Sequence, residues 1–323
     1  MTQPAIVNYH EGLANYIKKV AIVGAGGHIG KAIAEKLLET GKHSVTAITR
    51  AGKNSILPDG ITKALVDYND QESLVSALNE QEFLVITLSL NAAPDTHTKL
   101  VNAAAKAGVS YVMPNAYSIW AHNEAIQRDI PITKQVLENI AEVQRAGLIS
   151  ITLMNGFWYE WSLTAGPSTF GFDLENRTVT LYDDGKKAIN ISTWAQCGRA
   201  VASLLSQKIR PEDENDRSTT ITQWHNKTLL VSSFKISQRD ILDSVKRATQ
   251  TTAKDWKIEY EATEERYKVG AEQLQQGDPS GFLKMMYSRV FYPSGDGDFE
   301  PHNNLLGLPS EDLDAATCAA LTM

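Results

Sequence analysis

Short apolar runs and amphipathic segments alternate along the first half of the chain. A continuous apolar run, as at residues 20–23, is typical of a parallel strand that is buried on both faces. Apolar residues three or four positions apart, such as Ile33, Ala34 and Leu37, predict an amphipathic helix. Strands are predicted at residues 20–23, 64–67, 83–88, 110–113 and 149–154, with another that ends at Arg50, and helices at 96–106 and 132–146. We therefore predict an α/β fold with a parallel, doubly wound sheet.

Polar residues that accept hydrogen bonds from backbone N–H groups mark several helix starts. Asn69, with Glu72 three positions later, has the spacing of a capping box. Thr193 and Ser237 are predicted N-caps in the second half of the chain.

Beyond residue 156 the simple alternation stops. The segments 178–182 and 188–192 flank Asp183-Asp-Gly185, a turn sequence typical of a β-hairpin. We expect this half to form a smaller, mixed α/β region.

Spaced glycines directly follow the first strand. Gly24, Gly27 and Gly30 open the predicted helix, and Gly26 adds backbone freedom between them. Such glycines let the chain turn tightly, approach a diphosphate and pack the helix on the strand, while the free N–H groups of the helix attract an anion. A purely structural turn is the alternative. We predict that a dinucleotide contacts the residues of this turn, with His28 acting through its backbone N–H more than its ring: Gly24, Gly26, Gly27, His28, Ile29 and Gly30.

The end of the second strand indicates which dinucleotide is bound. An NAD site normally has an Asp or Glu about 20 residues past the glycines, where it binds the ribose 2′-hydroxyl. This chain has Arg50 and Lys53 there and no acid. Cations would attract the 2′-phosphate of NADP(H), and a guanidinium can bind it in a fork. The two residues could instead be solvated loop charges, but we predict NADPH as the cofactor.

Other cofactor contacts are expected where strands of the sheet end, because a doubly wound sheet binds ligands at its carboxyl edge. The residues predicted at these ends are Asp67, Leu88, Ser89, Asn115 and Asn155. The resulting division is a Rossmann-like dinucleotide-binding domain at 19–156, preceded by an extension at 1–18. Residues 157–323 form mainly a substrate-binding region, some elements of which pack back on the first domain.

Composition excludes several other classes of protein. The net charge of −7 argues against a nucleic-acid binder, because clustered Lys and Arg supply most phosphate affinity. No apolar segment approaches the roughly 20 residues that span a bilayer, and residues 1–19 lack a signal-peptide core. Neither the two cysteines, Cys197 and Cys318, nor the seven histidines have metal-ligand spacing. We expect a cytoplasmic protein without a metal, either a monomer or a homodimer.

The catalytic pattern of ordinary short-chain dehydrogenases is missing. These enzymes use Tyr-x-x-x-Lys on a helix, where both side chains share a face. The one match, from Tyr182 to Lys186, lies across the predicted hairpin turn. An ordinary short-chain dehydrogenase site is therefore not expected.

Four stretches resemble the NmrA-like and isoflavone-reductase-like family of atypical short-chain dehydrogenases, especially its fungal oxidoreductases. They are VAIVGAGGHIGKAIAEKLL at 20–38, ITRAGK at 48–53, the segment 98–114 and NGFWYEWSL at 155–163. The resemblance covers most of the chain and is strongest through residue 165. The family's reductases have Pro-Ser-Glu-Phe-Gly after the fifth strand, whereas this chain departs from it with Pro-Asn-Ala-Tyr-Ser at 114–118.

The resemblance implies that Lys134 is the catalytic lysine of the helix that follows. It would polarise or protonate the substrate oxygen, provided that burial and the helix N-terminus lower its pKa. The alternative is a surface lysine at a helix start. Tyr117 and His122 are two further candidate proton donors, although the alternatives, a packing tyrosine and a solvated loop histidine, are favoured for them.

Aromatic residues follow the sixth strand, where the family's substrate pocket begins. Large flat side chains there suit an aromatic substrate, although they could simply pack between the two regions. The predicted substrate contacts are Tyr117, Phe157, Trp158 and Trp161.

Two functions remain open from the sequence. The first is an NADPH-dependent reductase that transfers hydride to a small, aromatic carbonyl, enone or benzylic-ether substrate of secondary metabolism. The second is a non-catalytic, NmrA-type sensor that binds NAD(P) and reports redox state to a partner protein. The lysine at position 134 and the aromatic segment favour the enzyme.

Overall fold

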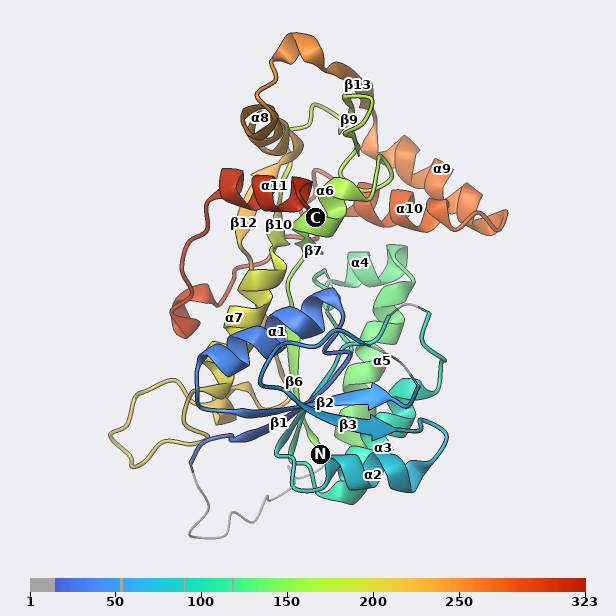
Figure 1. Cartoon of the computed structure of the whole chain (residues 1–323). Coiled ribbons are helices and arrows are strands. Elements are labelled where there is room, and N and C mark those ends of the chain that lie inside the picture. The colour runs from blue at the N-terminus through green and yellow to red at the C-terminus, as the bar shows by residue number, and fades with distance from the viewer. Residues whose placement is uncertain (1–14, 53–54, 90, 118) are drawn as a thin grey trace.

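The computed structural model describes residues 15–52, 55–89, 91–117 and 119–323. These residues form a central seven-stranded sheet with the strand order β11-β6-β5-β4-β1-β2-β3, and every neighbouring pair is parallel (Figure 1). The strands are β1 (Lys19–Val23), β2 (Ser44–Arg50), β3 (Thr62–Val66), β4 (Phe83–Ile86), β5 (Tyr111–Met113), β6 (Ile149–Met154) and β11 (Lys227–Leu230). The predicted doubly wound, Rossmann-like sheet is confirmed.

Alternating side chains of β1 enter two different cores. Val20 and Ile22 face the helices α1 (His28–Glu39) and α7 (Trp194–Leu205), while Ala21 and Val23 face the opposite side. This alternation explains the continuous apolar run, because a strand covered on both faces has no solvent-facing positions. The helices of the opposite side are α2 (Gln71–Leu78), α3 (Thr96–Ala107) and α5 (Ile132–Arg145).

Residues beyond β6 contribute to both halves of the molecule. Strand β11 extends the central sheet, and α7 packs against α1 so closely that a Cβ on Gly198 would lie 2.4 Å from the carbonyl oxygen of Ala32. Most of the other elements beyond β6 form the upper half in Figure 1, around a second core. That half has the sheets β12-β10-β7 and β13-β9-β8.

The strands of the upper half are β7 (Phe157–Trp158), β8 (Phe172–Asp173), β9 (Thr178–Tyr182), β10 (Ala188–Ser192), β12 (Phe234–Ser237) and β13 (Lys257–Glu261). The remaining α-helices are α4 (Glu124–Asp129), α6 (Tyr159–Thr164), α8 (Gln238–Thr249), α9 (Thr263–Gln275), α10 (Ser280–Val290) and α11 (Leu313–Leu321). Three short 3-10 helices lie at Ile221–Trp224, Ala253–Asp255 and Asn303–Leu306.

The predicted hairpin between β9 and β10 is wrong. The tight turn exists, since Gly185 N–H donates to the carbonyl of Tyr182 at 2.8 Å. However, β9 pairs with β8 and β13, while β10 pairs with β7 and β12, so the two strands belong to different sheets. The turn sequence sets only the local change of direction. The strands on either side of the turn form their hydrogen bonds with other strands instead of with each other.

The predicted capping box at Asn69 is also wrong. Asp70 is the N-cap of α2, and its carboxylate accepts from Glu72 N–H at 3.0 Å. The Asn69 side chain instead accepts from Lys99 Nζ at 3.1 Å. The predicted caps Thr193 and Ser237 are confirmed at the starts of α7 and α8.

Candidate cofactor and substrate site

The glycine turn joins β1 to α1 at the carboxyl edge of the sheet. Gly24 has a φ of +81°, and a Cβ at this position would lie 2.1 Å from the carbonyl oxygen of Thr87 at the end of β4. Gly30 is equally confined, since its Cβ would lie 2.2 Å from the carbonyl oxygen of Gly24. Backbone contacts of this kind fix the turn tightly against the neighbouring strand.

The start of α1 is suited to an anion. Its N-cap is Gly27, and within the described chain neither a side-chain cap nor an acidic residue occupies its first turn. Gly26, Gly27 and His28 are exposed, while Ile29 and Gly30 are buried behind them. Free backbone N–H groups at a helix N-terminus bind phosphate well, so these residues fit the diphosphate of a dinucleotide.

The ring of His28 leaves the turn and stacks on Trp194, the first residue of α7, with ring centroids 4.1 Å apart and planes 3° apart. The backbone N–H of Trp194 donates to the carboxylate of Glu160, at 3.0 Å for Oε1. Burial raises the pKa of Glu160 to about 7. The buried carboxyl group of Glu160 in α6 therefore holds the first residue of α7, Trp194, whose ring stacks on His28.

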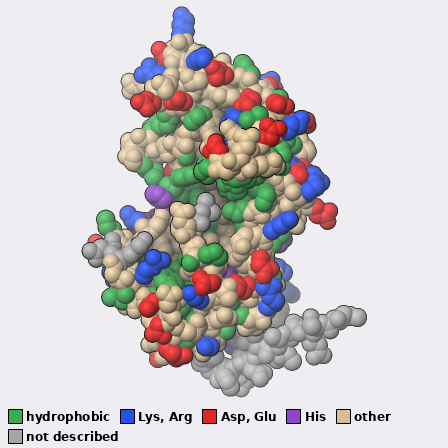
Figure 2. Space-filling model, turned by 90° about the vertical axis from the view of Figure 1, so that its right-hand side faces the viewer, with side chains coloured by type: hydrophobic (Ala, Val, Ile, Leu, Met, Phe, Trp, Pro, Cys, Tyr) green, Lys and Arg blue, Asp and Glu red, His purple; other side chains and the backbone are tan. Residues whose placement is uncertain are grey.

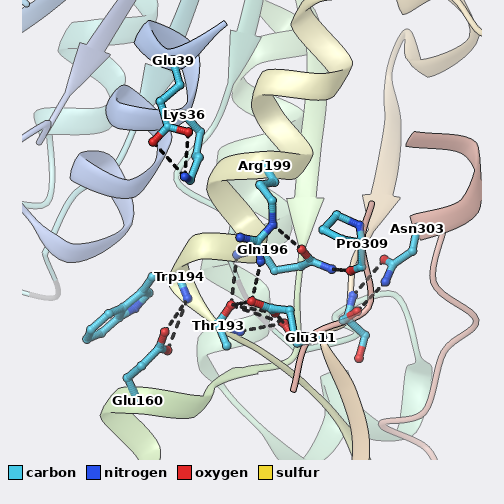
Figure 3. A network of polar contacts seen from close by, with 12 residues as sticks. Lys36, Glu39, Glu160, Thr193, Trp194, Gln196, Arg199, Asn303, Pro309 and Glu311 are labelled. Carbon is cyan, nitrogen blue, oxygen red and sulfur yellow. Dashed lines mark hydrogen bonds and ion pairs between the residues drawn. The ribbon is translucent and has the colours of Figure 1, made fainter. Parts of the chain in front are cut away.

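A second acid supports the same helix start from the C-terminal segment. Glu311 accepts from the Thr193 hydroxyl at 2.9 Å, and it also binds Arg199 of α7 (Figure 3). Gln196 Nε2 donates to the carbonyl of Pro309 at 3.0 Å. These contacts tie the segment between the 3-10 helix at Asn303–Leu306 and α11 along α7, and so join the central sheet to the upper half of the molecule.

Arg50 lies exposed at the end of β2, as the sequence predicts. Its guanidinium carbon is 5.6 Å from the ring centroid of Tyr68, which follows the neighbouring strand β3. Burial raises the pKa of Tyr68, so this ring is neutral and available for stacking. Asp67 is exposed beside it and accepts from Asn69 N–H at 2.9 Å. The predicted contact Lys53 lies outside the described residues.

The ends of β4 and β5 meet beside the glycine turn. Thr87 donates its hydroxyl to the carbonyl of Val23 at 2.7 Å, and Leu88 N–H donates to the side-chain oxygen of Asn115 at 2.9 Å. Ser89 is exposed at this edge. The predicted residues Leu88, Ser89 and Asn115 therefore lie together, next to the proposed diphosphate site.

Lys134 lies in the first turn of α5, which begins at the same edge of the sheet. It is exposed, and no other described residue forms a hydrogen bond or ion pair with its amino group. The first turn of α5 contains no acidic residue. The burial on which the predicted role of Lys134 partly depends is therefore not found, and its amino group lies exposed at the carboxyl edge of the sheet.

The other two candidate proton donors point elsewhere. The hydroxyl of Tyr117 is buried without a hydrogen-bond partner among the described residues, and burial together with the nearby thiol of Cys197 raises its pKa. His122 Nε2 lies 3.0 Å from the Thr228 hydroxyl in β11, and burial lowers the pKa of His122. Strand β11 is four strands from β1, about 19 Å at the usual strand spacing.

The aromatic residues after β6 divide between core and surface. Phe157 is 5% exposed and stacks on Tyr287 with centroids 3.8 Å apart, which leaves little of its ring for a ligand. Trp158 is partly buried, and Trp161 is 36% exposed. The side-chain oxygen of Asn155 is buried and has no partner within the described chain.

The surface narrows between the two halves of the molecule. Figure 2 shows a hollow at this waist, with hydrophobic side chains gathered along it.

Sequence reasoning missed several residues that support this edge: Tyr68, His97, Glu142, Glu160 and Trp194. Tyr68 follows a predicted strand end and could have been included on that ground. The other four lie inside helices or at their starts, and nothing local distinguishes them from packing residues.

Comparison with known proteins agrees with the predicted family. Residues 17–145 match the model of the NmrA-like family. The N-terminal part of this chain is therefore similar to the NmrA-like family. The resemblance inferred from the sequence is thereby confirmed.

One curated relative matches nearly the whole of this chain. Oxidoreductase aprR of Aspergillus flavus is 27% identical over 312 residues, which cover 94% of this chain and 98% of aprR. Two solved structures share the fold at 16% identity. AtPrR2 with NADP+ and (+)pinoresinol has a TM-score of 0.73 over 95% of this chain and 100% of its own. Isoflavone reductase has a TM-score of 0.71 over 94% of this chain and 99% of its own.

None of the helices in the described residues is long and apolar enough to cross a membrane. The described residues also contain no group of three His, Cys, Asp or Glu side chains that could hold a metal ion.

Proposed function

We propose that this protein is an NADPH-dependent oxidoreductase that reduces a small organic substrate. The observation that carries the proposal is the pairing of an uncapped α1 N-terminus with Arg50, which lies exposed over Tyr68 at the end of β2. An acidic residue in place of Arg50 would favour NADH, and a capped helix would not admit a diphosphate. The relatives named as oxidoreductases, and the neighbour named with NADP+, support this cofactor.

Each part of the site has a role in this proposal. Backbone N–H groups in the first turn of α1, such as those of His28 and Ile29, bind the diphosphate, and Arg50 binds the 2′-phosphate through charge-assisted hydrogen bonds. Bound NADPH would supply the hydride. Lys134 polarises the substrate oxygen and donates the proton that the oxygen takes up, which requires an amino group close to that oxygen.

For the substrate, we propose an aromatic carbonyl, enone or benzylic ether. The support is the apolar waist in Figure 2, together with the partly exposed aromatic residues Trp158 and Trp161, which follow β6 in the sequence. Flat apolar surfaces of this kind favour stacking with planar ligands. The names of the structural neighbours, which include (+)pinoresinol and isoflavone reductase, point in the same direction.

The test is NADPH consumption by the purified chain with a panel of quinones, enones, aromatic ketones and benzylic ethers. The proposal expects absorbance at 340 nm to fall with at least one planar substrate and not with small aliphatic ketones. Tight NADPH binding without turnover across the panel would contradict it.

That second result would favour a non-catalytic NAD(P)-binding sensor. The buried hydroxyl of Tyr117 and the absence of a helical Tyr-x-x-x-Lys motif are the observations on this side. A sensor should also bind a partner protein differently in the presence of NADP+ and NADPH, which a pull-down with each nucleotide would measure.

A further inference from the structure

Asn115, at the end of β5, is hydrogen-bonded through its side chain and both backbone groups. Its side-chain oxygen accepts from Leu88 N–H at 2.9 Å, and its carbonyl accepts from Asn139 Nδ2 at 2.8 Å. Its backbone N–H donates to Nε2 of His97 at 3.4 Å. Asn115 therefore connects the end of β4 with both α3 and α5.

The bond to Asn115 fixes the proton of His97. A backbone N–H can only donate, so Nε2 must accept and the ring proton must be on Nδ1. Nδ1 then donates to Glu142 Oε2 of α5, 2.6 Å away. His97 is 5% exposed, and burial lowers its pKa, which favours the neutral ring that this arrangement requires.

The same contacts reach the helix that carries Lys134. Asn139, which binds the Asn115 carbonyl, accepts from Gln135 Nε2 at 2.9 Å. Gln135 and Lys134 are adjacent in the first turns of α5. Movement of Asn115 would therefore displace both the β4 edge and the start of this helix.

In a doubly wound sheet the dinucleotide extends along the carboxyl edge from the strands that bind its adenosine half. Here Arg50 follows β2, and β4 and β5 lie on the other side of β1. The end of β4 therefore faces the nicotinamide half of the proposed cofactor.

We propose that His97, backed by Glu142, is a positioning residue for the nicotinamide half of the cofactor, which it orders by holding Asn115 against the end of β4. The inference rests on the proposed function and adds two residues to it that do not touch the ligand. The ring proton on Nδ1 and the accepting Nε2 are both needed, because the ring must bridge a carboxylate and an amide.

The experiment compares His97→Leu, His97→Gln and Asn102→Ala by calorimetry with two ligands. NADPH probes the whole site, and 2′,5′-ADP probes its adenosine half alone. His97→Leu cannot accept from Asn115 N–H, so the dissociation constant for NADPH should rise about tenfold, as expected for one lost hydrogen bond of ordinary strength. The constant for 2′,5′-ADP should stay within about twofold, because its site lies across β1.

The other variants separate positioning from general loss of structure. A Gln amide can present an oxygen where Nε2 lies, so His97→Gln should bind NADPH nearly as well as the native chain. Asn102 is exposed on the same helix α3, and Asn102→Ala should change neither constant. If His97→Leu does not fold, Glu142→Gln replaces it and should weaken NADPH binding about threefold, with 2′,5′-ADP again unaffected.

Equal weakening of both ligands in a folded variant, or no change in either, would overturn the positioning role. That result leaves the proposed function intact. Failure of the native chain to bind NADPH would instead overturn the proposed function and the inference together.

Discussion

The two ends of the proposed cofactor site are built in different ways. At the adenosine end, the glycine turn, the α1 N-terminus and Arg50 come from one continuous stretch, residues 19–50. At the nicotinamide end, Thr87, Asn115 and Lys134 come from separate segments that are held by buried and partly buried side-chain hydrogen bonds. The first end depends on backbone geometry, and the second depends on contacts between residues far apart in the sequence. Substitutions at the two ends should therefore affect different properties of the protein, such as stability at the adenosine end and turnover at the nicotinamide end.

The largest effect is expected from Lys134→Ala at the nicotinamide end. Loss of a general acid typically lowers turnover by 10²-fold to 10⁴-fold, so kcat should fall at least about a hundredfold. NADPH affinity should not change, because no described contact links the amino group to the glycine turn. Steady-state kinetics with calorimetry measures both. The variant Lys134→Arg is the control, because it keeps the positive charge but has no proton to donate at neutral pH. Near-native turnover in Lys134→Ala would show that Lys134 takes no part in the mechanism.

At the adenosine end, Gly24→Ala should damage the fold itself. A side chain there combines a left-handed φ with a 2.1 Å contact to backbone, which should reduce the free energy of unfolding by about 3 kcal/mol. Gly41→Ala is the matched control, since Gly41 has a φ of +65° and nothing within 4 Å of its Cβ position. It should lose about 1 kcal/mol. Urea unfolding compares the two, and equal losses would mean that the turn is not tightly packed.

Glu160, which binds the backbone of Trp194 next to His28, should make the free energy of unfolding depend on pH. The pKa of Glu160 is raised from 4.5 to about 7, so between these values the folded chain binds more protons than the unfolded chain. This carboxyl therefore removes stability as pH rises from 4.5 to 7, by about 3 kcal/mol in total. Glu160→Gln keeps an acceptor for Trp194 N–H and should lose less stability between pH 5 and 8. Identical pH profiles of unfolding would contradict the raised pKa.

The smallest effect on stability and turnover is expected from Tyr117→Phe. This variant tests whether Tyr117 is a packing residue of the core or a proton donor at the nicotinamide end. The Tyr117 hydroxyl is buried and has no hydrogen-bond partner among the described residues, so its removal should leave the free energy of unfolding unchanged or raise it by up to about 1 kcal/mol. Turnover should stay within about twofold. A hundredfold fall in kcat would instead make Tyr117 the proton donor.

The contrast also explains what the sequence could reveal. The strand, glycines and helix of residues 19–50 are each set by local propensity, so both the turn and Arg50 were predicted in place. Asn115 was predicted from its position at a strand end, but His97 and Glu142 were not, because their pairing joins α3 to α5 only after folding. The supposed hairpin at 183–185 failed for the same reason, since strands at 234–237 and 257–261 determine where its two arms pair.

The central claim is that a cradle of backbone amides and one guanidinium select NADPH. Isothermal calorimetry of the native chain and of Arg50→Ala with NADPH and NADH tests it most directly. We predict that the native chain binds NADPH at least about tenfold more tightly than NADH, and that Arg50→Ala removes most of this preference. Equal dissociation constants for the two nucleotides in the native chain, or no binding of either, would contradict the account.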